Sequence, residues 1–156
     1  MIHLFSLNNA KILILISILG VSSWSQKITD FYSHFGMNPI ETALANKQPA
    51  PNITGLQLDN ARGMFMIIDS NTLTLDIMGM QKKSLCKDHK IAASKMTMTC
   101  TVDDKTDYMI LSLKDGKLHV IKKKDSITLV FDKLTDLEFK SRQEKAIAAL
   151  KIMTGM

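Results

Sequence analysis

The chain of 156 residues is long enough for one domain with its own hydrophobic core. Its formal net charge of +5 at neutral pH is mild, and only 6% of its residues are aromatic. This composition argues against a nucleic-acid-binding protein, which uses a strongly basic surface and stacking aromatic side chains.

Residues 1–25 have the pattern of a secretory signal peptide. Lys11 precedes an apolar run of nine residues, and Ser23 and Ser25 are small residues placed for cleavage before Gln26. The run is shorter than the roughly 20 residues that span a bilayer. We therefore expect a secreted or periplasmic protein, cleaved near Ser25/Gln26 and without an integral membrane span after cleavage. An uncleaved N-terminal anchor is the alternative.

Residues 26–50 predict two short helices and a proline linker. Apolar residues at the spacing of an amphipathic helix predict the first helix, through Ile28, Phe31, Tyr32 and Phe35. Asn38 and Pro39 predict the start of the second helix, because Asn caps helices and Pro suits their first turn. Pro49 and Pro51 then predict an extended linker.

Residues 51–134 predict an antiparallel β-domain, because short runs of alternating apolar and polar residues are separated by turn residues. Asp115-Gly116 is a strong hairpin signal between two such runs. Strands are expected over residues 53–58, 64–68, 73–77, 95–102, 108–113, 118–121 and 127–131, with residues 81–90 as a strand or loop at a sheet edge and a possible bulge at Gly79.

The fold class is therefore mainly β: an antiparallel meander of six to eight strands that forms a small barrel or a sandwich. In strand number and spacing the pattern resembles the small lipocalin-like barrels of bacterial envelopes. Residues 135–156 predict a C-terminal helix packed on this β-domain. Thr135 and Glu138 form the pattern of a capping box at its start, and Gly155 is placed to end it.

Cys86 and Cys100 are the only two cysteines. In an oxidising compartment, an isolated pair of cysteines predicts a structural disulfide, with a metal pair or a redox pair as the alternative readings. The bond would close a loop of about 15 residues, and chain entropy assigns roughly 3 kcal/mol to such a loop.

Enzyme motifs are absent from the sequence, so we expect neither catalytic residues nor a cofactor. It has no P-loop, no dinucleotide-binding glycine motif, no nucleophile elbow and no His-Glu-x-x-His motif. The three histidines that follow the leader, His34, His89 and His119, are isolated from one another in sequence.

Met-x-Met occurs three times, at Met64/Met66, Met78/Met80 and Met96/Met98. Thioethers are soft ligands that suit Cu(I), although methionine is also a flexible filler of apolar cores. The segment from His89 to Met98 resembles the ligand strand of small periplasmic copper- and silver-binding proteins of efflux systems, which are β-barrels with a His, a Met-x-Met pair and a Trp over the metal. The resemblance implies a metal site at His89, Met96 and Met98, but the Trp-Pro of that family's motif is missing.

Lysines form two clusters that could bind an anionic partner or could protect exposed sheet edges. The members of these clusters are Lys82, Lys83, Lys87 and Lys90, with Lys95 nearby, and then Lys122, Lys123 and Lys124.

Taken together, these patterns predict a small, non-catalytic binding protein. Its ligand would be a small apolar molecule inside the barrel, or a protein partner in the envelope that it binds as an inhibitor or immunity protein does. A Cu(I)- or Ag(I)-handling protein is the second hypothesis, and a purely structural envelope protein is the third.

Overall fold

The structure is a computed structural model that describes residues 27–122 and 126–156, so the predicted signal peptide lies outside the described residues. The elements in chain order are η1 (Ile28–Phe31), β1 (His34–Met37), α2 (Pro39–Ala45), α3 (Leu56–Ala61), β2 (Met64–Ile68), β3 (Thr72–Ile77), β4 (Met80–Ala92), β5 (Lys95–Val102), β6 (Lys105–Lys114), β7 (Lys117–Lys122), β8 (Thr128–Leu134) and α4 (Asp136–Thr154).

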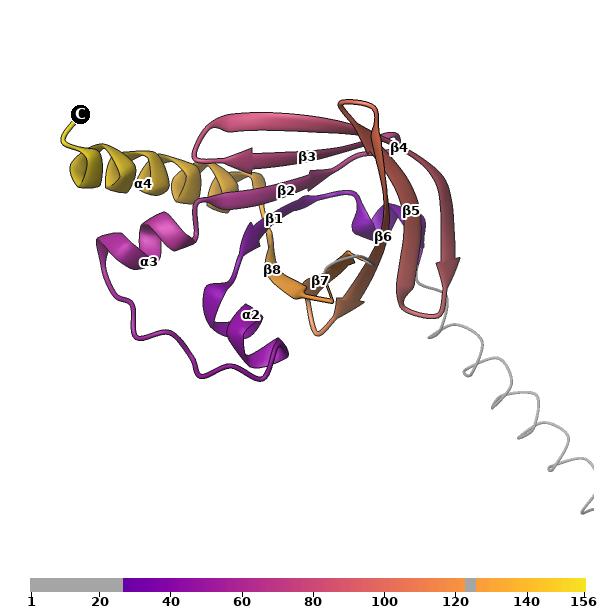
Figure 1. The fold of residues 1–156 in the computed structure, drawn as a ribbon, viewed down its shortest axis with the longest axis horizontal. Helices are drawn as coiled ribbons and strands as arrows, with labels where there is room; N and C mark the ends of the chain where they lie inside the picture. The colour runs from indigo at the N-terminus through magenta and orange to yellow at the C-terminus, as the bar shows by residue number, and fades with distance from the viewer. Residues whose placement is uncertain (1–26, 123–125) are drawn as a thin grey trace, which may run out of the picture.

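The eight strands form a closed antiparallel barrel in which each strand pairs with the next (Figure 1). The first and last strands close it, with His34 opposite Leu134 and Met37 opposite Phe131. The predicted antiparallel meander is therefore confirmed, and of the two predicted forms it takes the barrel. None of the helices in the described parts of the chain is long and apolar enough to cross a bilayer.

Two-residue turns join several pairs of consecutive strands and set their register. Asp115 and Gly116 both have positive φ, 52° and 72°, which confirms the predicted hairpin. Met78 and Gly79 form a turn of the same kind between β3 and β4, with φ of 53° and 92°. Gly79 is thus a turn residue and not a bulge. The irregularity in this region lies within β4, where the register with β5 shifts between Lys87 and Lys90.

The predicted amphipathic helix over Ile28 to Phe35 is wrong in its second half. Only residues 28–31 are helical, as the 3-10 helix η1, and residues 34–37 are strand β1. The apolar spacing was real, because Phe31 and Phe35 are both fully buried in the core. Phe35, however, points into the barrel from a strand whose hydrogen-bond partners lie far away in sequence, in β2 and β8.

The strand expected over residues 53–58 is also wrong, because this region forms helix α3 from Leu56 to Ala61. Strand β2 is already paired with β1 on one side and with β3 on the other, so a further strand cannot pair with it. The second N-terminal helix is confirmed as α2, with Asn38 as its N-cap and Pro39 in its first turn.

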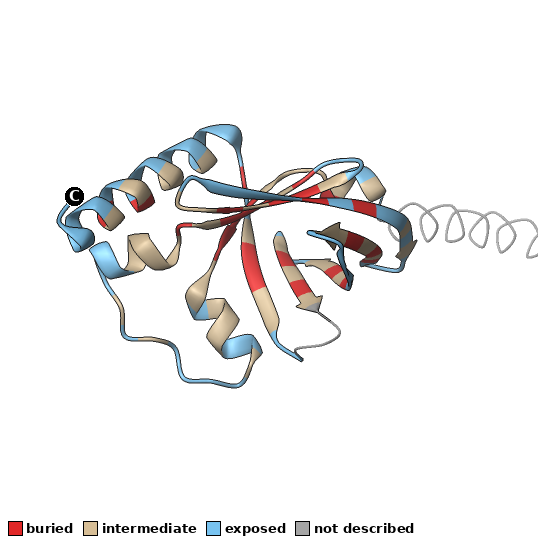
Figure 2. Ribbon diagram, turned by 45° about the horizontal axis from the view of Figure 1, so that its top comes forward, coloured by how far each residue is buried: buried red, intermediate tan, exposed pale blue. Residues whose placement is uncertain are grey.

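The core fills one half of the barrel with aromatic side chains. Phe31 from η1, Phe35 from β1 and Phe131 from β8 are fully buried, together with Met96 and Met98. Burial alternates along the strands, as expected when one face of each strand lines the interior (Figure 2). The helix η1 lies at the barrel end that carries the β2–β3, β4–β5 and β6–β7 turns.

The predicted C-terminal helix is present as α4, which packs mainly on α3, has smaller contacts with β1 and β8, and leaves its other side to solvent (Figure 2). Its capping box is confirmed, and the Thr135 backbone N–H and hydroxyl, which both bond Glu138, lower the pKa of that carboxyl. A hydrogen bond of 2.7 Å joins Gln143 to the fully buried Asp76 of β3.

The tightest part of this contact is where Ala146 meets Gly63. Ala146 is fully buried, and a Cβ atom added at Gly63 would lie 2.8 Å from the Cβ of Ala146. Neither position can therefore accept a larger side chain without moving the helix.

We predict that Ala146→Leu lowers the free energy of unfolding by about 1–3 kcal/mol through overpacking. The matched control is Ala148→Leu on the exposed side of the same helix, which should stay within about 0.5 kcal/mol of the parent. Urea unfolding followed by circular dichroism measures both, and equal losses in the two variants would contradict this account of the interface.

Candidate functional site

A cavity of about 490 Å³ occupies the other half of the barrel. Its wall is mostly apolar, and it is contributed by strands β2 to β8. The apolar lining residues are Met64, Met66, Leu73, Leu75, Cys100, Val102, Met109, Val120 and Leu129, and the polar ones are Lys82, Ser84, Asp103, Lys105 and Asp107.

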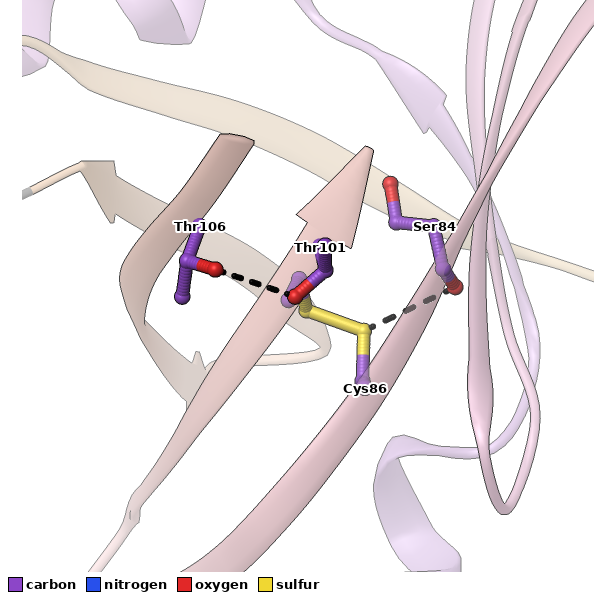
Figure 3. The surroundings of a disulfide bond; sticks show 5 residues. Ser84, Cys86, Thr101 and Thr106 are labelled. Carbon is purple, nitrogen blue, oxygen red and sulfur yellow. Dashed lines mark hydrogen bonds between the residues drawn. A yellow bond between two sulfur atoms is a disulfide. The ribbon is translucent and has the colours of Figure 1, made fainter. Parts of the chain in front are cut away.

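The alternation of the strands explains this lining. Met98, Cys100 and Val102 of β5 share the inner face, while Thr97, Thr99 and Thr101 face outward, as the threonine pattern indicates. On the outer surface Thr101 hydrogen-bonds Thr106 of β6 across a distance of 3.1 Å (Figure 3). Strand β5 therefore supplies core at one end and cavity wall at the other.

The mouth of the cavity carries charged side chains from β4, from β6 and from the turn between β5 and β6. Lys82 of β4 forms an ion pair of 2.6 Å with Asp103 in the β5–β6 turn. Lys105 and Asp107 follow on the inner face of β6. Both side chains of the ion pair are largely exposed, so it contributes little to stability, but it places a polar rim above an apolar interior.

The predicted disulfide between Cys86 and Cys100 is confirmed (Figure 3). The two residues are direct register partners on β4 and β5, and both are buried. The Sγ of Cys86 lies 3.8 Å from the carbonyl oxygen of Ser84, but a disulfide sulfur has no proton to donate, so this is a van der Waals contact. Cys100 brings the disulfide to the cavity wall.

The three Met-x-Met pairs lie in three different environments. Met64 and Met66 line the cavity, whereas Met78 and Met80 belong to the β3–β4 hairpin, where Met80 is 70% exposed. Met96 and Met98 are fully buried in the hydrophobic core.

His89 lies at the irregular point of β4, between two register pairs that bracket Met98 of β5. Its Nε2 atom is buried and has no hydrogen-bond partner within the described parts of the chain. No group of three or more His, Cys, Asp or Glu residues among the described positions could hold a metal ion. The predicted site at His89, Met96 and Met98, which relies on thioethers, stays a prediction.

The structure divides the first predicted lysine cluster. Lys83, Lys87 and Lys90 are exposed and pair in register with Thr74, Thr99 and Thr97, which places these lysines on the outer face of β4. Lys82 instead lines the cavity mouth. Lys83 lies where the register pairs of β4 are with β3, whereas Lys87 and Lys90 lie beyond the last register pair with β3, where β4 pairs only with β5. Lys87 and Lys90 therefore lie on a stretch of β4 with an open edge, in agreement with the edge interpretation.

The second lysine cluster cannot be placed in the same way. Lys123 and Lys124 lie outside the described residues, as does the side chain of Lys122 at the end of β7.

The polar residues of the cavity were not recognised in the sequence. Lys82 was assigned to a lysine cluster, and Ser84, Asp103 and Asp107 were not singled out as candidate site residues. All of them line the same cavity.

Comparison with known proteins adds no functional assignment: no family model, curated protein or solved structure matches the chain.

We predict that the double variant Cys86→Ala/Cys100→Ala folds, but that its free energy of unfolding is about 2–3 kcal/mol lower, because the unfolded chain gains freedom in the opened loop. Urea unfolding measures the loss. The parent protein unfolded with a reductant present should match the variant, and an unchanged unfolding midpoint would show that the disulfide contributes nothing to stability.

Proposed function

We propose that the protein binds a small apolar molecule inside its barrel. The cavity of about 490 Å³ carries this proposal. Its volume falls within the range of roughly 300–1,000 Å³ that is typical of small-molecule sites, and such sites combine an apolar wall with a few polar groups.

The contrast between the two halves of the barrel supports the same conclusion. Unfilled apolar space costs stability, about 24 cal/mol for each Å³ in a well-studied core. Phe31, Phe35 and Phe131 are fully buried in the core, and none of them lines the cavity. In the other half, Val102, Val120 and Leu75 are smaller side chains that leave the space open. Larger side chains at these positions would fill the space and raise the stability of the fold. Their absence is what we expect if the space serves to hold a ligand.

The proposed place of action is the secretory or periplasmic compartment. The disulfide is compatible with an oxidising environment, where such bonds form and persist. The N-terminal signal pattern agrees with export. A carrier of small apolar molecules in that compartment is the function we favour. A protein partner at the exposed surface of β4 is the outcome to pursue if no ligand binds.

The test is a binding titration with the neutral apolar fluorophore N-phenyl-1-naphthylamine, whose emission rises in apolar surroundings. Val102→Trp places a large side chain in the cavity wall, so it should weaken binding at least about tenfold. The matched control is Leu85→Trp, because Leu85 is 71% exposed on the outside of β4. The control should bind like the parent protein.

Both variants must keep the circular dichroism spectrum of the parent. The proposal is wrong if the parent protein does not bind the probe, or if Val102→Trp binds it as tightly as Leu85→Trp does. A protein that begins at Gln26 has no other tryptophan, so the fluorescence of the introduced residue also reports whether it is shielded from water.

Cu(I) or Ag(I) binding is the second candidate, and one observation favours it. His89 keeps a buried ring nitrogen without a hydrogen-bond partner in the described structure, at the point of β4 that faces Met98 of β5. A neutral imidazole and thioethers together make a soft donor set.

If this site exists, anaerobic titration with Ag(I) should show one equivalent bound, and Met98→Leu should weaken that binding at least about tenfold. Met80→Leu is the control, because Met80 is exposed and distant in register. Equal affinity of the parent protein and Met98→Leu would end the metal hypothesis.

A further inference from the structure

Among the described residues that line the cavity, Ser84 carries the only buried polar side chain. Ser84 is only 8% exposed, and it lines the cavity from the inner face of β4. Its side chain has no hydrogen-bond partner within the described parts of the chain. By contrast, the carboxylate of buried Asp76 accepts hydrogen bonds from Gly79, Gln81 and Gln143.

The Ser84 hydroxyl oxygen is not one of the fully enclosed side-chain atoms that lack a partner, so it is accessible from the cavity. A ligand that displaces water from this hydroxyl loses affinity unless it replaces the hydrogen bond. Along the inner face of β4, Ser84 is the next residue inward from Lys82 at the rim, which places it roughly 7 Å below the rim. The wall continues beyond it with Met109 and Val120, which are almost fully buried. A ligand in this cavity would therefore meet one hydrogen-bonding group between a charged rim and an apolar interior.

The charges at the rim do not favour an ionic ligand. Among the described lining residues, Lys82 and Lys105 are balanced by Asp103 and Asp107. Lys82 and Asp103 already neutralise each other as an ion pair. A carboxylate placed beside Ser84 would lie near Asp107 as well as near Lys105, so it would gain little from the rim.

We propose that the ligand is an uncharged amphipathic molecule with a hydroxyl or carbonyl oxygen, which hydrogen-bonds Ser84 while its apolar part contacts Met66, Met109 and Val120. This inference rests on the proposed function and names the ligand class. A serine hydroxyl can both donate and accept, so it suits an alcohol as well as a ketone or an ester.

The test compares three ligands of equal chain length, 1-decanol, n-decane and decanoate, by displacement of N-phenyl-1-naphthylamine. Ser84→Ala should raise the Kd of 1-decanol by roughly threefold to tenfold, the loss expected for one hydrogen bond, and should leave the Kd of n-decane unchanged. Ser112→Ala is the matched control, because Ser112 alternates with Leu111 and Leu113 and faces outward on β6. It should alter neither Kd.

The results separate the two proposals. If the parent protein binds none of the three ligands and not the probe, the proposed function fails and this inference fails with it. If 1-decanol and n-decane both bind but Ser84→Ala weakens them equally or not at all, only the role of Ser84 is overturned. If decanoate binds much more tightly than 1-decanol and loses that advantage in high salt, the uncharged ligand class is overturned.

Discussion

The four residues of β1 join the two ends of the meander, because His34–Met37 pair with β2 on one side and with β8 on the other. Without them the sheet would have two open edges, which expose unpaired backbone groups and invite pairing with other chains. At the closing strand, Gly36 leaves room for a side chain from α4. A Cβ atom at Gly36 would lie 2.6 Å from Nη1 of Arg142, the residue of α4 that forms an ion pair with Asp132 of β8.

Closure determines what the interior can contain. Every strand turns alternate residues inward, so the sizes of those residues decide where the barrel is filled. Phe31, Phe35 and Phe131 converge near the η1 end and fill it. Toward the other end the inward positions carry smaller or polar side chains, and the cavity of about 490 Å³ follows from that difference. The fully buried aromatic side chains therefore lie in the core, and the cavity lies where the inward side chains are smaller.

Local signals in the sequence predict local structure well here. The Asp115-Gly116 turn, the Asn38 and Thr135 caps and the Cys86–Cys100 pair were all recognised from neighbouring residues, and all are present. The pairing of strands that lie far apart along the chain could not be predicted from the sequence. Strand β1 was predicted as part of a helix because the apolar residues around it have helical spacing. Its partners β2 and β8 lie far away along the chain, so no local pattern encodes the closure of the barrel.

On β4 the inward face is polar and the outward face carries an apolar residue, which is the reverse of an ordinary strand. For this reason the sequence did not reveal that β4 contributes to a cavity wall. Leu85 faces solvent, whereas Lys82 and Ser84 face the interior. A hydrophobicity pattern alone therefore assigns the wrong face. The disulfide corrects it: Cys100 shares the dry face of β5 with Met98, so its partner Cys86 must also point inward, and alternation then carries Ser84 and Lys82 to the same side. A covalent link between two strands thus fixes the orientation of Ser84 toward the cavity.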